Sequence, residues 1–265
     1  MMTYIKRAME DTFLRMNKEF PVILLTGPRQ VGKTTMLQNL LQQENIGREY
    51  ITLDDLAERE LAKNDPKMFF QLHKPPVFID EVQYAPELFP YIKIHVDEHH
   101  NPGDFWLTGS QIFKLMEGVQ ESLAGRICLL HMSPMSQAEI NGLPSIPFKV
   151  DLEGLMERSK HYTALDTPAL FERIFNGAMP AIISKQYTQL QNVYSSYVAT
   201  YKDRDVKEIS GQIDSLKFMN FITATAALTG QILNYKTIAD ASDISQPTAK
   251  TWLGILERLG IIFYL

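Results

Sequence analysis

Short runs of apolar residues, each bounded by turn residues or charges, recur along the first half of the chain. The first run, Val22–Leu25, lies between a proline and a glycine, which is typical of a strand buried on both faces of a parallel sheet. The others are Glu49–Leu53, Val77–Ile79, Phe105–Leu107 and Ile127–Leu130. Enough chain separates consecutive runs for a helix. The pattern therefore predicts an α/β domain with a five-stranded parallel sheet.

Helical patterns flank this predicted sheet. Apolar residues at helical spacing predict a helix over residues 3–19, ended by Pro21. After Pro134 a turn-rich segment at 141–147 leads into residues 150–232, which read mainly as helix, with breaks at Thr167-Pro168 and Gly177–Pro180. We therefore expect a sheet domain over residues 1–140 and a helical lid or connector over 141–211.

The last part of the chain has a different pattern. Two short helices are predicted at Tyr235–Ala241 and Gln246–Leu259, followed by the apolar stretch Ile261–Leu265. A helix-turn-helix that enters a strand predicts a winged-helix-like domain over residues 212–265. Its second helix carries only Lys250 and Arg258 as cations, so a DNA-reading module and a protein-packing module are both open.

Composition narrows the class of protein. Of 265 residues, 45% are hydrophobic and 22% are charged, which excludes a disordered or fibrous chain. The net charge of −5 provides no general attraction to nucleic acid or anionic membrane. The single cysteine, Cys128, excludes a disulfide framework and a zinc site built from several thiolates. The apolar runs are too short to span a membrane, so we expect a cytoplasmic protein with no membrane segment.

The loop after the first strand matches the pattern G-x-x-x-x-G-K-[ST]. A strand precedes it and a helical run follows, which is the context in which this motif binds phosphate. The glycines let backbone amides wrap around phosphate groups, and the lysine reaches the β and γ oxygens. The threonine after the lysine supplies a hydroxyl ligand for Mg²⁺. The predicted nucleotide-binding residues are Gly27, Pro28, Arg29, Gln30, Val31, Gly32, Lys33, Thr34 and Thr35.

Asp80 and Glu81 directly follow the third predicted strand, as in a Walker B strand. We expect Asp80 to hold Mg²⁺ through its water shell, together with Thr34. We expect Glu81 to orient and deprotonate the water that attacks the γ-phosphate. A second carboxylate at this position favours hydrolysis over nucleotide binding alone.

Hydroxyl residues lie at the end of the fourth predicted strand. The carboxyl end of a strand beside a phosphate loop is where a polar residue touches the γ-phosphate or its water. Thr108 is the first candidate for this sensor and Ser110 is the second. Both hydroxyls are also suited to cap the helix expected near residue 111, so this structural role is open too.

Arg126 precedes the fifth predicted strand, at the end of a predicted helix. A guanidinium at this corner can reach a phosphate in its own site or in a neighbouring subunit and offset developing charge there. The helix dipole also favours a cation at this position, so a purely structural role remains an alternative.

Several of these segments together resemble a known family. The segments are LTGPRQVGKTT, ITLDD, FIDEVQYAPELFPYIK, WLTGSQ, ESLAGR and SPMSQAEI, within residues 22–140. They resemble the AAA-like P-loop ATPases of bacteria and archaea, which pair this ATPase with a C-terminal domain of uncharacterised function. A weaker similarity extends through NGAMP and YKDRDVKEI to the helix-turn-helix.

The resemblance implies the strand order 5-1-4-3-2, ATP as the nucleotide, and Arg126 at the place of an arginine finger. Family members commonly continue into a region that resembles restriction endonucleases, so we expect this chain to be truncated or naturally short. The usual sensor of such ATPases is asparagine, whereas this strand offers Thr108 and Ser110.

These observations favour an ATPase that uses ATP and Mg²⁺ and moves its helical and winged-helix parts on an unidentified protein or DNA partner. If Arg126 contacts the phosphate bound to a neighbouring copy, the protein is a homo-oligomer. The alternative is a nucleotide-regulated DNA-binding protein with slow hydrolysis. A small-substrate kinase is disfavoured, because Asp80-Glu81 supplies a base suited to water.

Overall fold

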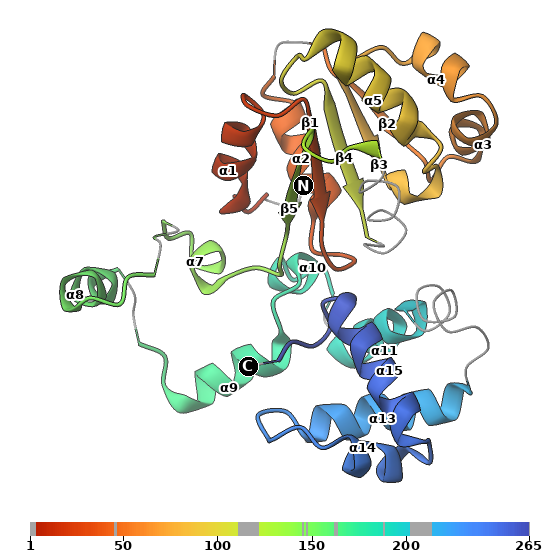
Figure 1. Cartoon of the computed structure of the whole chain (residues 1–265). Helices are drawn as coiled ribbons and strands as arrows, with labels where there is room; N and C mark the ends of the chain where they lie inside the picture. The colour runs from red at the N-terminus through yellow and green to blue at the C-terminus, as the bar shows by residue number, and fades with distance from the viewer. Residues whose placement is uncertain are drawn as a thin grey trace. The chain divides into compact units, whose positions relative to one another are not determined.

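Five parallel strands form one sheet in the computed structural model (Figure 1). They are β1 (Val22–Thr26), β2 (Glu49–Thr52), β3 (Val77–Asp80), β4 (Phe105–Gly109) and β5 (Ile127–His131). Their spatial order is β2-β3-β4-β1-β5, which is the expected order 5-1-4-3-2 counted from the other edge. All five predicted strands and their parallel arrangement are confirmed.

The structure describes residues 4–44, 47–110, 122–144, 146, 148–161, 164–187, 189–201 and 214–264. The chain divides into two compact units, residues 1–188 and 189–265. The sheet belongs to the first unit. The finer division expected from sequence, at residues 140 and 211, stays a prediction. Among the described helices, none has both the length and the apolar character needed to cross a membrane.

Helices cover both faces of the sheet, because its strands are apolar on both sides. Helices α1 (Met9–Met16) and α2 (Lys33–Leu41) pack on one face, where Ile23 and Leu25 of β1 contact Phe13, Met36 and Leu37. Helices α3 (Leu56–Asn64), α4 (Pro66–Leu72) and α5 (Leu88–His99) pack on the other face against Val22 and Leu24. Side chains thus alternate along β1 between two hydrophobic cores, which explains its continuous apolar run.

The first helix is shorter than the sequence pattern predicts. It begins at Met9, whereas residues 4–7 are not helical. The backbone N–H of Arg7 donates to Oε1 of Glu10 at 2.6 Å, and the hydroxyl of Tyr4 donates to the same oxygen at 2.6 Å. The carboxylate of Glu10, in the first turn of α1, therefore accepts from the N–H of Arg7, which precedes the helix.

The connector after β5 consists of short capped helices. They are α7 (Gln137–Ile140), α8 (Leu152–Lys160), α9 (Thr167–Asn176) and α10 (Pro180–Ile183). The side chains of Ser136, Asp151 and Asp166 cap the first three by accepting from backbone N–H groups. The predicted breaks at Thr167-Pro168 and Gly177–Pro180 are confirmed.

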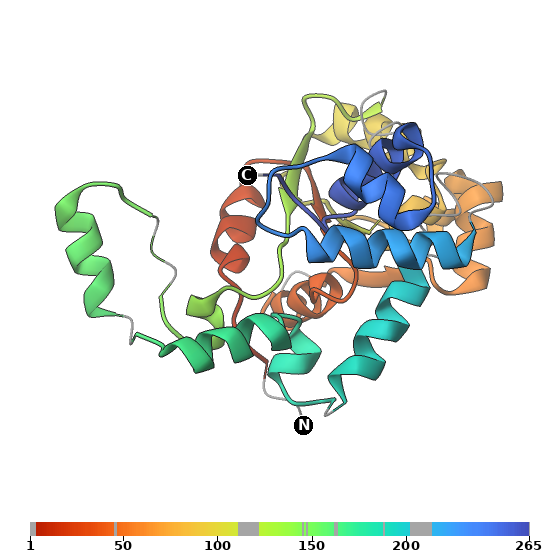
Figure 2. The same ribbon diagram turned by 90° about the horizontal axis from the view of Figure 1, so that it is seen from below.

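The described part of the second unit is helical. It contains α11 (Leu190–Tyr201), α13 (Ser215–Ala227), α14 (Tyr235–Ser242) and α15 (Gln246–Arg258). Helices α13, α14 and α15, drawn in blue, pack on one another (Figure 1 and Figure 2). Trp252 of α15 lies edge-on to Phe218 and Phe221 of α13, with centroid distances of 5.2 Å.

The prediction of a strand at Ile261–Leu265 is wrong for the residues that the structure describes there. Residues 261–264 form no strand, because the backbone N–H groups of Ile261 and Ile262 turn back to the carbonyl of Leu256. Gly260, at φ +69°, makes this reversal at the end of α15. The predicted helix-turn-helix pair is confirmed as α14 and α15, but the winged-helix assignment is not.

Arg48 is a buried cation at the amino edge of the sheet. Its NH1 donates to the carbonyl of Gly103 at 2.7 Å, and its Nε donates to Oε2 of Glu44 at 2.9 Å. The guanidinium lies 4.0 Å above the ring of Trp106. Arg48 thus joins the start of β2 to the loop before β4 and to the end of α2.

We predict that Arg48→Ala lowers the free energy of unfolding by about 3 kcal/mol, because it leaves buried carbonyl and carboxylate acceptors without a donor. Urea denaturation followed by circular dichroism measures this loss. Lys6, whose ion pair with Asp11 is solvent-exposed, is the control, and Lys6→Ala should change the value by less than about 0.5 kcal/mol. A loss below about 1 kcal/mol for Arg48→Ala would contradict the structural role of Arg48.

Candidate functional site

The loop between β1 and α2 has a backbone that requires glycine at both ends. Gly27 has a φ of +141°, and a Cβ there would lie 2.2 Å from the carbonyl oxygen of Met132. Gly32, at φ +94°, is the N-cap of α2. Any other residue would clash at the first position and be strained at both. The glycines of the sequence motif therefore shape a tight turn that aims the N-terminus of α2 at the carboxyl edge of the sheet.

Lys33 is a buried cation at the start of α2. Its Nζ donates to the carbonyl oxygens of Gly27 at 3.0 Å and Pro28 at 2.9 Å. Burial lowers the pKa of Lys33 to about 8, although Glu81 and Asp80 oppose the shift. The lysine is therefore held beside carbonyls at the end of a helix whose dipole favours anions.

The carboxylate of Asp80, at the end of β3, accepts hydrogen bonds from hydroxyl groups of three segments. Thr34 donates to its oxygens at 2.9 and 3.1 Å, and Thr108 of β4 donates to Oδ1. Tyr50 of β2 donates to Oδ2 at 3.2 Å. Burial and the neighbouring Asp80 raise the pKa of Tyr50 to about 12. The sequence analysis missed Tyr50, since a tyrosine within a strand has no motif that separates it from a packing residue.

Glu81 follows Asp80 in a left-handed conformation with a φ of +57°. Ser110 donates to its carboxylate oxygens at 3.3 and 3.2 Å, and Nε2 of Gln83 donates to Oε2. The backbone N–H of Glu81 donates to the hydroxyl of Thr108 at 3.2 Å. Thr108, which is fully buried, thus lies between Asp80 and Glu81, while Ser110 contacts the carboxylate of Glu81.

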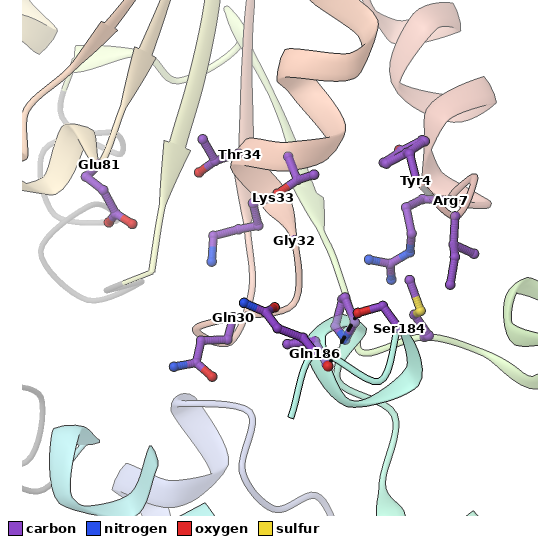
Figure 3. Close-up of a pocket in the computed structure, with 14 residues that line it drawn as sticks. Tyr4, Arg7, Gln30, Gly32, Lys33, Thr34, Glu81, Ser184 and Gln186 are labelled. Carbon is purple, nitrogen blue, oxygen red and sulfur yellow. Dashed lines mark hydrogen bonds between the residues drawn. The ribbon is translucent and has the colours of Figure 1, made fainter. Parts of the chain in front are cut away.

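A cavity of about 390 Å³ opens beside these residues (Figure 3). Gln30, Gly32, Lys33, Thr34 and Thr35 line it from the loop and α2, and Glu81 lines it from the end of β3. The remaining walls are segments that the sequence analysis did not assign to the site. They are Tyr4, Ile5 and Arg7 before α1, Met135 after β5, and Pro180, Ala181, Ser184 and Gln186 at α10. The sequence predicts residues 4–7 only as part of a helix over residues 3–19, and only the NGAMP segment gives a signal for α10.

Arg126 lies at the opposite edge of the sheet from this cavity. It directly precedes β5, whose first residue pairs with Val22 at the start of β1. Five residues of strand separate it from the loop edge, which corresponds to about 16 Å. Its Nε and NH2 donate to both oxygens of Asp97 on α5, at 2.5 and 3.1 Å. The alternative in which Arg126 serves its own site is therefore inconsistent with the fold. Most of the helix expected before Arg126 lies outside the described residues.

Two sequence families match this chain. A model described as an AAA domain matches residues 19–141, and a model described as a domain of unknown function matches residues 167–265. Two curated relatives are 29% identical over 236 residues, and both are named as uncharacterized proteins: Mb2031c of Mycobacterium bovis and Rv2008c of Mycobacterium tuberculosis. The match covers 89% of this chain but 47% of each relative, so this chain spans about half the length of these relatives.

A solved structure has a similar fold. The chain aligns with the Walker-type ATPase PABY2304 of Pyrococcus abyssi at a TM-score of 0.57 and 16% identity, over 97% of this chain and 90% of that one. The strand order, the glycine-shaped loop before α2 and the match to the AAA domain model agree with one another. Residues 19–141 therefore match the AAA domain family in sequence, and their fold is similar to that of a Walker-type ATPase.

Proposed function

We propose that the cavity binds ATP and that the chain hydrolyses it. The observation that carries this proposal is the buried ammonium of Lys33, which lies at a helix N-terminus on the wall of a cavity of about 390 Å³. A buried cation needs an anionic partner of matching size, and the phosphates of a nucleotide supply one. The volume lies within the range of small-molecule sites.

The cavity has two chemically different ends. Lys33, Thr34 and Glu81 form a polar end that suits phosphates. Ile5, Met135 and Pro180 offer apolar walls that suit a flat base, and Ser184 and Gln186 offer hydrogen-bonding groups for its edges. We assign the base to the apolar end. The connector helix α10 would then contact the nucleotide directly.

Thr34 and Asp80 fit a magnesium ion. Their oxygens lie 2.9 Å apart, and hydroxyl and carboxylate oxygens are the ligands that Mg²⁺ prefers. Bound there, Mg²⁺ would neutralise phosphate charge. Glu81 accepts a proton from a water molecule as the water oxygen bonds to the γ-phosphorus. The bond to the β-phosphate oxygen breaks, and ADP and phosphate leave.

The hydroxyls of Thr108, in β4, and of Ser110, directly after β4, would have different roles. The hydroxyl of Thr108 is fully buried and bonded to Asp80, so we propose that it positions the aspartate. The hydroxyl of Ser110 contacts the carboxylate of Glu81 and is the better candidate for a sensor. This reverses the order of preference that the sequence suggested.

We further propose that nucleotide state moves the C-terminal parts of the chain on a protein partner. The region 214–265 carries four basic residues (Lys217, Lys236, Lys250, Arg258) and four acidic residues (Asp214, Asp240, Asp243, Glu257). A balanced charge gives little attraction to a phosphate backbone. This favours a protein partner over a DNA partner. The second hypothesis is a nucleotide-regulated DNA-binding protein that hydrolyses ATP slowly.

We predict that ATP affinity falls as the pH rises above about 8. The pKa of Lys33 is lowered to about 8, so the free protein loses this proton above that pH, whereas bound phosphates favour the protonated form. Binding then requires proton uptake, and the dissociation constant should rise by about tenfold per pH unit. His131, the nearby imidazole, has a pKa lowered by burial and by Lys33, so it stays neutral over this range. Calorimetric titrations between about pH 7 and pH 10 measure the effect.

Lys33→Arg and Lys33→Ala are the matched controls for this titration. Arginine stays ionised, so Lys33→Arg should bind more weakly but with a flat pH profile. Lys33→Ala should lose measurable binding while the chain stays folded. Unchanged ATP affinity in Lys33→Ala would refute the proposed site.

We predict that Glu81→Gln keeps ATP affinity within about twofold but lowers the turnover number by about 10²–10⁴-fold. The amide preserves the shape of the side chain but cannot accept the proton of water. Phosphate release under saturating ATP measures turnover. Glu87→Gln, at an exposed glutamate of the same loop, should hydrolyse ATP normally. Normal turnover in Glu81→Gln would assign the base to another residue.

We predict that Arg126 acts on the site of a neighbouring copy, since its own site is out of reach. Turnover per chain should then rise with protein concentration, and Arg126→Ala should lose about 10³-fold in turnover with little change in affinity. Wild-type chains mixed with excess Lys33→Ala chains should remain active, because the binding-deficient copy still donates its arginine. Normal hydrolysis by Arg126→Ala would leave only a structural role in its pair with Asp97.

A further inference from the structure

Arg7 is a buried cation that joins the phosphate loop to two other segments. Only 4% of its surface is exposed. Its NH1 donates to the carbonyl of Val31 at 2.6 Å, in the loop directly before Gly32 and Lys33. Its NH2 donates to the carbonyl of Ser133 at 2.7 Å, in the segment after β5. Figure 3 shows the guanidinium extending from the N-terminal segment toward the loop.

Glu139 of α7 completes this arrangement. Its Oε1 accepts from Nε of Arg7 at 3.0 Å and from the backbone N–H of Ala8 at 2.8 Å. Its Oε2 accepts from the backbone N–H of Ser136 at 2.6 Å. Burial opposes ionisation, but these backbone donors and Arg7 outweigh it and lower the pKa of Glu139. The carboxylate is therefore ionised, and Arg7 and Glu139 form a buried ion pair.

The ion pair of Arg7 and Glu139 lies beside the cavity and contacts segments that form its walls. Arg7 lines the cavity together with Gly32, and a Cβ on Gly32 would be 3.7 Å from NH1 of Arg7. The segment that Arg7 and Glu139 hold also carries Met135, whose backbone N–H donates to the carbonyl of Ala178 just before α10. The guanidinium of Arg7 thus connects the phosphate loop to the cavity wall that carries Met135.

We propose that Arg7 is a positioning residue for nucleotide binding, held in turn by Glu139. It acts through the carbonyl of Val31, which orients the turn at Gly32 and hence the ammonium of Lys33. It also fixes residues 133–139 and so the wall that carries Met135. This inference rests on the proposed nucleotide site.

A direct contact of Arg7 with phosphate would predict a different role for Glu139. A guanidinium that only supplied charge to the ligand would not need three protein acceptors from separate segments, and Glu139 is not a wall of the cavity. If Arg7 acts by position, Glu139 matters for affinity although it does not touch the ligand. This difference makes the two roles separable.

The experiment measures the dissociation constant of a fluorescent ATP analogue, by anisotropy, for the full chain and its variants. Arg7→Ala should raise the constant by at least about tenfold, and Glu139→Gln by at least about threefold. Once Arg7 is alanine, Glu139→Gln should add less than about twofold, since both act through one pair. Arg7→Lys should resemble Arg7→Ala, because one ammonium cannot bridge the three acceptors.

Arg48→Ala is the matched control. It removes another buried arginine with carbonyl and carboxylate partners, but at the amino edge of the sheet. It should leave the dissociation constant within about twofold of wild type at a temperature where circular dichroism shows every variant folded. If Arg7→Ala does not fold, Arg7→Lys and Glu139→Gln decide the question.

Wild-type affinity in all Arg7 and Glu139 variants would overturn the inference. So would an equal loss in Arg48→Ala, because affinity would then follow global stability. A loss in Arg7→Ala with wild-type affinity in Glu139→Gln would show direct contact with phosphate and overturn the positioning role. A wild-type chain that binds no ATP analogue would overturn the proposed function itself.

Discussion

The insertion of β4 between β1 and β3 is the constraint on which the site depends. Phe105, the first residue of β4, pairs with both Val22 and Val77, so the three strands start in register and run to the same edge. This register brings Thr34 within hydrogen-bonding distance of Asp80, 46 positions away, and Thr108 within reach of the same carboxylate. Parallel strands cannot be joined by tight turns, so the long crossovers leave that edge open for loops.

The site concentrates charge in a place where burial is costly. Ionised Lys33 lowers the stability of the fold at pH values below about 8, because its pKa is lowered relative to the unfolded chain. The cost is tolerable because two hydrophobic cores on opposite faces of the sheet stabilise the strands that carry the site. The cation is thus prepared for an anionic ligand at the expense of the protein's own stability.

The two edges of the sheet carry different kinds of ion pair. At the amino edge, Arg48 contacts Glu44 and backbone carbonyls, and Arg126 contacts Asp97. At the carboxyl edge, Arg7 and Glu139 connect the phosphate loop to the connector that leads toward the second unit. Arg7 thus contacts both the phosphate loop, at Val31, and the segment 133–139, at Ser133 and Glu139.

Local patterns in the sequence determined the sheet strands, the phosphate loop and the carboxylates after β3, because each depends on neighbours a few residues apart. Glycine at 27 and 32 is required by the backbone of one loop, and apolar runs such as Val22–Leu25 are required by burial on both faces.

Only the tertiary structure decided which distant segments complete the site. Tyr50 and Arg7 have no local signal, and α10 has only the resemblance of the NGAMP segment, since their roles arise from hydrogen bonds or cavity walls shared with residues far away in the chain. Ile261 and Ile262 show the opposite failure: their apolar pattern predicts a strand, but a strand needs a partner, and their N–H groups bond to Leu256 instead. Sequence patterns report what a segment can bury, whereas the folded chain decides what each polar group can reach.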